Sequence, residues 1–319
     1  MTSFISLIFT LNIYQILQAL ISQSELLYSL VSVTKSTQMR DIKSSPKFYI
    51  WKSSRLYIGI NHEPFRKHTY GWSQLVVCLH GKIRIKLSDG TEVTTRSCMI
   101  KAGTVVKEQI FNTHDTVIAI YYLNPISQEY LILQNQMTSV SKGVSYNHPT
   151  EGDLAQLLRH IMMATVSPNQ AHRLFKDALI EPHLRQTIVK KFDPRIIKIL
   201  QHIRENFSDN IPMSDYAVAV HLSESRLNKL FKEQMGIPIT KYRLQFRVSI
   251  GIILLAAGYP VTVAAYEAGF SSSAHFSTCF SDMVGVQPST DILKLSDMNL
   301  FISKDVIKAF IPADTCKLG

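Results

Sequence analysis

The sequence predicts an α+β protein in which a small N-terminal β-barrel precedes an all-α domain with two helix-turn-helix units. Between about residues 48 and 124, short runs of alternating apolar and polar residues predict strands. After about residue 150 the apolar residues recur at helical spacing instead. Within that helical part, a pattern of short helix, turn and second helix occurs twice, roughly 48 residues apart.

Residues 82–87 give the clearest strand, because apolar and basic side chains alternate there with a period of two. Asp89 and Gly90 follow it, and this pair is preferred at the centre of a tight hairpin turn. Further strands are predicted at residues 55–60, 74–79, 98–101, 105–110 and 116–123.

These patterns divide the 319 residues into five parts. They are an apolar N-terminal extension (1–47), a β domain (48–136), a helical linker or dimerisation region (137–192), a double helix-turn-helix domain (193–291) and a C-terminal tail (292–319). The tail after Ser289 is apolar enough to pack against the rest of the chain, and the sequence assigns it no function.

The first repeated unit lies between about residues 214 and 236. Ser214 is expected to cap its first helix, and Ser223 its second. The second helix is expected to bury Leu227, Leu230 and Phe231. Its opposite face carries Ser225, Asn228, Lys229 and Lys232. Serine, asparagine and lysine are side chains that reach base edges or phosphates in a major groove. Gly236 is expected to end this helix in a left-handed conformation.

A long helix over residues 239–257 is predicted to end at Gly258, after which the pattern recurs. Ser271 is expected to cap the second helix of this unit, and Phe276 and Phe280 to be buried. A single helical hairpin of this kind occurs in many globular proteins, so it is the recurrence that favours a DNA-binding domain. The predicted DNA contacts are Ser225, Arg226, Asn228, Lys229, Lys232, Ser273, Ser277 and Thr278.

Residues 194–289 resemble the DNA-binding domain of the AraC/XylS family of transcription regulators. The matching residues are Ala217, Leu222-Ser223, Leu227, Leu230-Phe231-Lys232, Gly236, Tyr242, Arg247, Leu254-Leu255, Ala265, Gly269-Phe270-Ser271, His275-Phe276, Phe280, Gly285-Val286 and Pro288-Ser289. The resemblance implies seven helices, two of which read successive major-groove turns of a non-palindromic site in double-stranded DNA. It also implies RNA polymerase as a partner and, usually, activation of transcription.

The chain departs from the family pattern in its charge. Family members often carry basic residues at the positions of Thr278 and Ser281, whereas residues 258–291 contain no Lys or Arg. Because neutralising phosphates supplies most non-specific affinity, the second unit is predicted to bind DNA weakly and the first to anchor the domain. The formal charge of +10 is no guide to the interface. Residues 1–193 hold 21 Lys and Arg against 13 Asp and Glu, whereas residues 194–291 hold 9 against 8.

The β-rich segment resembles the cupin-like barrel that precedes this DNA-binding domain in many relatives. The resemblance rests on strand spacing, on His80-Gly81 and on residues 101–103. Such barrels bind small effectors, or metals in enzymatic relatives. A metal cupin needs a His-x-His pair with a nearby Glu, which is missing around His68, so no metal, no cofactor and no enzymatic activity are expected.

An effector pocket is the predicted use of the barrel. Tyr57, His68, Tyr70 and Trp72 are expected to line it, with an ordinary core role as the alternative. The effector itself stays unknown from the sequence.

Residues 4–33 carry one formal charge, Glu25, and are long enough to cross a bilayer. Polar residues such as Asn12 and Gln15 interrupt the stretch, and no basic region precedes it. Three interpretations stay open: a packed N-terminal helix or an upstream start with translation from Met39, a membrane-associated segment, and a dimer-forming helix.

The sequence therefore predicts a transcription regulator that binds double-stranded DNA, responds to a small effector and forms a homodimer. A cytoplasmic location is expected, because the four cysteines (Cys78, Cys98, Cys279 and Cys316) form no C-x-x-C pair and no disulfide framework. Two alternatives remain, namely a regulator tethered to the membrane by residues 4–33 and a cupin-type metalloenzyme.

Overall fold

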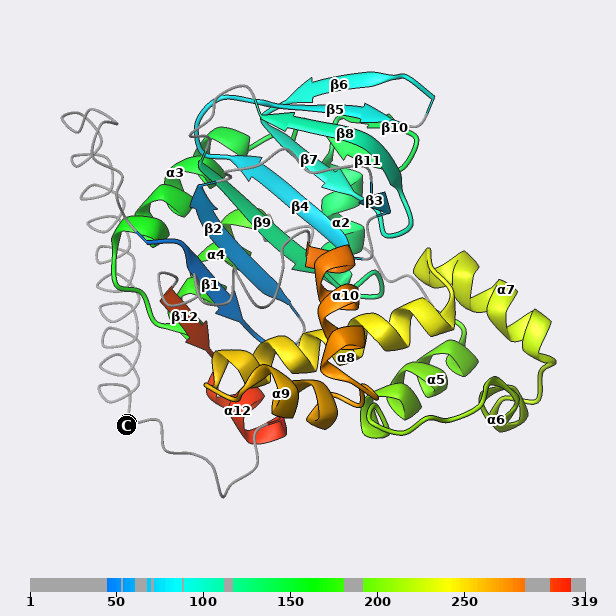
Figure 1. Cartoon of the computed structure of the whole chain (residues 1–319). Coiled ribbons are helices and arrows are strands. Elements are labelled where there is room, and N and C mark those ends of the chain that lie inside the picture. Colours follow the sequence, from blue (N-terminus) through cyan, green and yellow to red (C-terminus); the bar gives the residue numbers. More distant parts are fainter. Residues whose placement is uncertain are drawn as a thin grey trace, which may run out of the picture. The chain divides into compact units, whose positions relative to one another are not determined.

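The computed structural model describes residues 45–310, except 53, 61–67, 70–71, 88, 112–116, 181–191 and 285–298 (Figure 1). Residues 4–33, for which a membrane role stayed open, lie outside the described residues, as do residues 311–319. In the part of the chain that the structure describes, no helix is both long enough and apolar enough to cross a membrane.

The larger of two sheets has eight strands in the order β10-β11-β7-β4-β9-β2-β1-β12. Their bounds are β1 (Lys47–Ile50), β2 (Arg55–Ile60), β4 (Ser73–Cys78), β7 (Ser97–Ile100), β9 (Val117–Leu123), β10 (Ser139–Ser141), β11 (Val144–Tyr146) and β12 (Asn299–Ile302). All neighbouring strands are antiparallel except β1 and β12, which run parallel. Every residue of β4 is buried, as expected of a strand covered on both faces.

The smaller sheet has the order β3-β8-β5-β6, formed by β3 (His68–Thr69), β8 (Val105–Phe111), β5 (Ile83–Leu87) and β6 (Glu92–Thr95). The alternation predicted for β5 is present, since Ile83, Ile85 and Leu87 are buried and Arg84 is exposed. The predicted hairpin turn to β6 has Gly90 at a φ of +91°. The expectation of an α+β fold with an N-terminal β region is confirmed.

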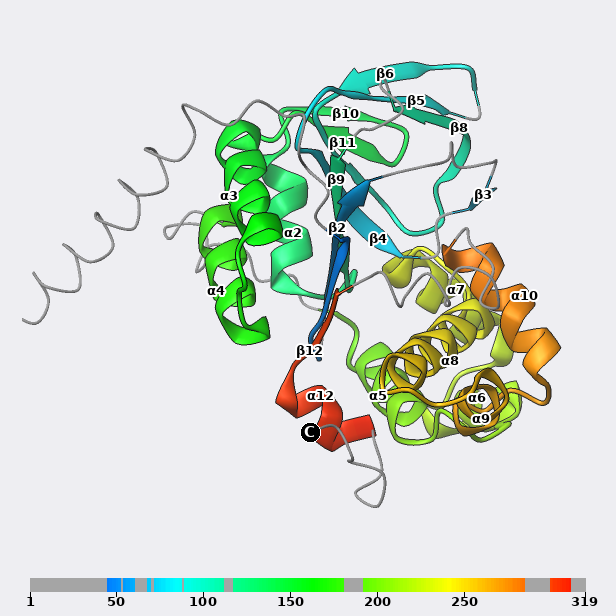
Figure 2. The same ribbon diagram turned by 60° about the vertical axis from the view of Figure 1, so that its left-hand side comes forward.

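Three helices accompany the sheets: α2 (Gln128–Gln136), α3 (Glu151–Met163) and α4 (Pro168–Leu179). They lie together on one side of the large sheet in both views (Figures 1 and 2). Phe175 of α4 meets Tyr121 of β9 edge to face, with 4.9 Å between the ring centroids. Trp51, just after β1, donates from Nε1 to the carbonyl oxygen of Pro168 at 2.8 Å. The predicted β domain ends at residue 136, but the β10–β11 hairpin follows that residue. The large sheet therefore extends into the region predicted as a helical linker.

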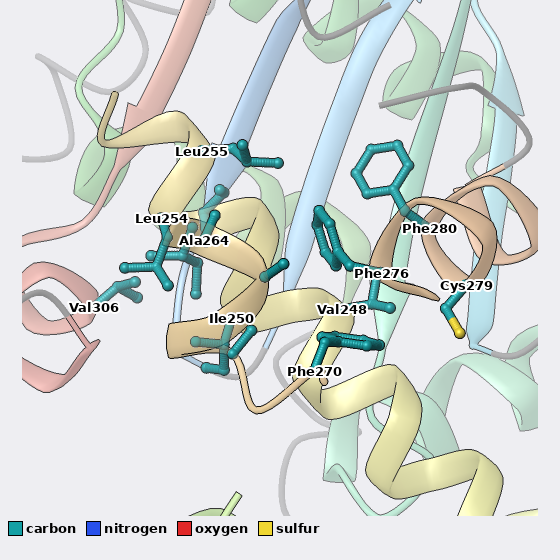
Figure 3. Packing of buried hydrophobic residues seen from close by; sticks show 14 residues of the cluster. Val248, Ile250, Leu254, Leu255, Ala264, Phe270, Phe276, Cys279, Phe280 and Val306 are labelled. Carbon is teal, nitrogen blue, oxygen red and sulfur yellow. The ribbon is translucent and has the colours of Figure 1, made fainter. Parts of the chain in front are cut away.

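The C-terminal half contains α5 (Pro194–Glu205), α6 (Met213–Ala219), α7 (Glu224–Met235), α8 (Ile239–Ala256), α9 (Val261–Glu267), α10 (Ser273–Val284) and α12 (Lys304–Phe310). The predicted long helix over residues 239–257 is α8. Two apolar clusters fill this half. One joins α5, α6 and α7 around Ile199, Leu227 and Phe231. The other joins α8, α9 and α10 around Leu254 and Phe276 (Figure 3).

The described part of the tail bridges the two halves of the chain. Its strand β12 pairs with β1, and Val306 of α12 is fully buried in the cluster that also contains Ile50 and Leu254. Phe310 at the end of α12 meets Phe246 of α8 at a ring-centroid distance of 6.4 Å. Residues 299–310 of the tail are thus part of the fold, as the apolar composition of the tail predicts.

The substitution Val306→Ala is expected to lower the free energy of unfolding by about 1–3 kcal/mol, because it removes buried apolar surface and leaves a cavity. Chemical denaturation of both proteins measures this difference. Lys308→Ala on the exposed face of the same helix is the matched control and should change stability by less than about 0.5 kcal/mol. Equal stabilities for the two variants would show that α12 does not pack as described.

Candidate nucleic-acid interface

The helix α7 begins and ends as its sequence predicts. The Ser223 hydroxyl accepts a hydrogen bond from the backbone N–H of Arg226 at 3.3 Å, which caps the helix. Gly236 ends the helix with a φ of +82°, a left-handed conformation that suits glycine. The expected cap at Ser214 is wrong: Pro212 occupies the cap position, two residues earlier, and the Ser214 hydroxyl donates to the Asp215 carboxylate.

The predicted DNA-facing side of α7 is largely open to solvent. Ser225, Arg226, Lys229 and Lys232 are exposed, whereas Leu227 and Phe231 are fully buried on the opposite side. Leu230, also expected to be buried, is only partly so. Asn228 is partly buried, and its Oδ1 has no hydrogen-bond partner among the described residues. This amide is therefore placed at the edge of the exposed face.

The second predicted reading helix, α10, has a different cap and a different surface. The Ser272 hydroxyl accepts from the N–H of His275 at 3.2 Å, so Ser272 is the capping residue and the expectation for Ser271 is wrong. Thr278 is exposed, but its hydroxyl donates to the carbonyl oxygen of Ala274 at 3.1 Å. Ser273 and Ser277 are half-buried, while Gly285 lies outside the described residues.

Two arginines on α8 fix the start of the first unit. Arg243 donates to the carbonyl oxygens of Ile211 (2.7 Å) and Asp209 (2.9 Å). Arg247 donates to those of Phe207, Ser208 and Asp209, the shortest bond being 2.7 Å. A guanidinium presents several donors in a rigid plane, so each arginine can hold consecutive carbonyls of one loop. This loop leads directly into α6.

A glycine on α8 fixes the second unit. A Cβ atom built on Gly251 would overlap the ring of Phe276 on α10, so only a glycine allows this approach. Phe276 also meets Phe270 and Phe280 edge to face, at centroid distances of 5.2 and 5.8 Å (Figure 3). The predicted burial of Phe276 and Phe280 is confirmed. Both units are therefore held by the same long helix.

A groove separates the exposed end of α7 from the loop that follows β7. It has a volume of about 620 Å³ and is lined by residues that include Lys229, Lys232, Lys101 and Lys142. Gly103 and Gly236 also line it, and they lie so close that a Cβ on either one would overlap backbone of the other segment. Both glycines have a positive φ. The last turn of α7 is thus in direct contact with the β half.

Of the four predicted effector residues, Tyr57 and Trp72 lie in different surroundings. Tyr57 is partly buried against the apolar core of the sheet, and burial raises the pKa of its hydroxyl to about 12. Trp72 instead lines a small pocket between β2, α5 and α8. The side chain of His68 and all of Tyr70 lie outside the described residues. Within the described ranges, no group of His, Cys, Asp and Glu has the geometry of a metal site.

Comparison with known proteins supports the assignment of the helical half. Residues 216–291 match the family model described as a helix-turn-helix domain. The arabinose operon regulatory protein of Escherichia coli is 30% identical over 108 residues, which are 33% of this chain and 37% of that protein. The chain therefore matches little more than a third of that relative's length. The probable transcriptional regulator LumQ of Photobacterium leiognathi is 21% identical over 70% of this chain and 90% of its own.

Among solved structures, ToxT from Vibrio cholerae shares the fold over 77% of this chain and 98% of its own, with a TM-score of 0.54 and 15% identity. A wild-type ToxT structure with a bound unsaturated fatty acid gives a TM-score of 0.51 at 16% identity, over 80% of this chain and 97% of its own. At these identities the likeness concerns the fold alone. The resemblance of the C-terminal half to the AraC/XylS DNA-binding domain is confirmed by the family model and the arabinose regulator.

The substitution Gly251→Ala is expected to cost about 1–3 kcal/mol of stability, because the added methyl group forces α10 away from α8. Thermal unfolding of the purified chain measures this loss. Gly152→Ala is the matched control, since Gly152 also lies in a helix but has open space around it. That control should leave stability unchanged or raise it by about 0.5–1 kcal/mol. A Gly251→Ala protein as stable as this control would refute the close packing of α8 and α10.

Proposed function

We propose that this chain is a DNA-binding transcription regulator of the AraC/XylS type, in which α7 and α10 enter the major groove. The observation that carries the proposal is structural: one long helix, α8, holds two helix-turn-helix units through Arg243, Arg247 and Gly251. The exposed face of α7 offers serine, arginine and lysine to a duplex. The two sequence relatives named above are an operon regulatory protein and a probable transcriptional regulator, which favours this function over a cupin-type metalloenzyme.

The two reading helices are proposed to contribute unequally to the affinity for DNA. Arg226, Lys229 and Lys232 lie on the exposed face of α7, whereas residues 258–291 contain no Lys or Arg. Since the Thr278 hydroxyl is bonded within its own helix, α10 offers few free donors to a base. The first unit would then supply most of the phosphate contacts, and the second would contribute shape and weak hydrogen bonds.

The β half is proposed to bind a small effector and to transmit its presence to α7. ToxT, which shares the fold, has been crystallised with an unsaturated fatty acid, and this supports an effector role for the corresponding half here. The contact of Ala102 and Gly103 with Gly236 joins this half to the end of α7. The proposal also includes two protein partners. One is RNA polymerase, and the other is a second copy of this chain, bound through residues 137–192.

The direct test is a titration of the purified chain against duplex DNA from its own upstream region and against a random duplex. The regulator should prefer its own region by at least about a thousandfold at physiological salt. Equal affinities for the two duplexes, with or without candidate effectors, would contradict the proposal.

Alanine at Lys229 is expected to weaken specific binding by about 1–3 kcal/mol, roughly five- to 150-fold, because it removes a cation that faces the duplex. Thr278→Ala is the comparison in the second unit and should change affinity by less than about threefold. A gel-shift titration at two salt concentrations measures both, and the salt dependence should become shallower only for Lys229→Ala. Comparable losses of DNA affinity for the two variants would rule out unequal contributions of α7 and α10.

The groove beside α7 gives a prediction about regulation. Gly103→Ala should push the loop away from Gly236 and widen the groove that Lys229 and Lys232 line, so that affinity for DNA without effector rises severalfold. Gly90→Ala is the matched control, because Gly90 also has a positive φ but has open space around it. Both variants carry the same backbone strain of about 1–2 kcal/mol, and only the first disturbs the contact. Identical DNA affinities would show that this contact does not restrain α7.

A further inference from the structure

An arginine at the start of β2 has a buried Nε atom that is unpaired among the residues that the structure describes. The Arg55 side chain is partly buried, and its Nε atom is fully enclosed without a hydrogen-bond partner among the described residues. Burial lowers the pKa of this guanidinium to about 10, which leaves it charged at neutral pH. A charge held out of water is costly unless another group compensates it.

Within the described lining of the pocket, no carboxylate balances this charge. Arg55 lines a cavity of about 60 Å³ between β2, α5 and α8, and no Asp or Glu belongs to its described lining. The other charged residues there are Lys52 and Arg204, which add positive charge. The nearby phenols of Tyr122 and Tyr242 stay neutral, because burial raises the pKa of both hydroxyl groups. Among the residues that the structure describes, the pocket therefore carries positive charge without a carboxylate to balance it.

A second donor in the same pocket is also unsatisfied. Gln245 of α8 is 2% exposed, and its Nε2 has no hydrogen-bond partner among the described residues. Leaving one buried amide donor unpaired is already unfavourable, and here it lies in the same cavity as a buried guanidinium. A carboxylate accepts hydrogen bonds from both kinds of donor and neutralises the charge.

Apart from Asn124, the remaining lining residues are apolar, and they determine the kind of molecule that fits. Ile237, Phe246 and Phe310 line the cavity, and the Trp72 ring lies 5.1 Å from the guanidinium carbon of Arg55. About 10–15 Å³ of such volume holds one water molecule, so 60 Å³ holds about four to six non-hydrogen atoms. That is the size of a carboxylic acid with two to four carbons.

We propose that this pocket binds a short-chain organic carboxylate, with its carboxylate group on Arg55 and Gln245 and its alkyl part against Phe246 and Phe310. As an effector site it rests on the proposed function, but the binding itself requires no DNA. The pocket joins a strand of the β half to α8, the helix that holds both reading units. Occupancy would therefore stabilise the contact between the two halves.

Calorimetric titration of the full chain with butyrate tests the site, with butyramide as the uncharged analogue of the same shape and inorganic phosphate as an anion without an alkyl part. Butyrate is expected to bind at least about tenfold more tightly than either, because it alone offers both features. It should also raise the melting temperature. Equal binding of butyrate and butyramide, or no heat and no thermal shift with butyrate, would overturn the proposal.

Substitutions separate a binding role from a structural one. Arg55→Met keeps the length of the side chain but removes the charge, and should weaken butyrate binding at least about tenfold. Because the charge is uncompensated in the free protein, the melting temperature without ligand should not fall. Lys52→Met is the matched control, since Lys52 is an exposed cation on the same lining, and butyrate affinity should change less than about threefold.

An unchanged affinity for Arg55→Met would overturn the proposal. If that variant does not fold, Gln245→Leu replaces it. The same loss of butyrate binding is then expected, and an unchanged affinity would again overturn the proposal. These measurements contain no DNA, so their failure is distinguishable from failure of the regulator function, which the duplex titration tests separately.

Discussion

The helix α8 is the constraint on which the rest of the C-terminal half depends. Its 18 residues span about 27 Å, and each part of that length meets a different neighbour. Tyr242 meets Phe231 of the first unit, while Gly251 receives Phe276 of the second. Phe246 lies between them and contacts both apolar clusters. The relative placement of α7 and α10 is therefore determined by side chains on one rigid element.

The same helix also connects DNA reading to the β half. Gln245 and Phe246 face the pocket that contains Arg55 of β2, and the end of α7 touches the loop at Gly103. A change at either place acts on an element that contacts the reading helices directly. The basic surplus of the chain fits this arrangement, since most of it lies before residue 194, where Lys101 and Lys142 border the groove beside α7.

Much of the fold followed from local patterns. Three kinds of feature depend only on residues close together in the sequence and can therefore be predicted from it. They are the period-two strands, the left-handed glycines such as Gly236 and the two apolar helix faces. The caps of α6 and α10 are harder to predict, because each has a competing residue nearby. Pro212 takes the position expected for Ser214, and Ser272 takes that expected for Ser271. The pairing of β12 with β1 and the position of Arg55 beside α8 could not be predicted, since both depend on residues far away in the sequence. The exposed face of α7 was predictable, whereas the partial burial of Asn228 was not.

The parallel pairing of β1 with β12 has a consequence for biosynthesis. The two strands are separated by about 250 residues, so the ribosome completes β1 long before it releases its edge partner. At a translation rate of about 5–20 residues per second, the edge of β1 stays unpaired for roughly 10–50 s. During that interval an unpaired strand can associate with other nascent chains. When β12 pairs with β1 it becomes the edge strand in its place, and an edge of only four residues offers little backbone for pairing with another chain.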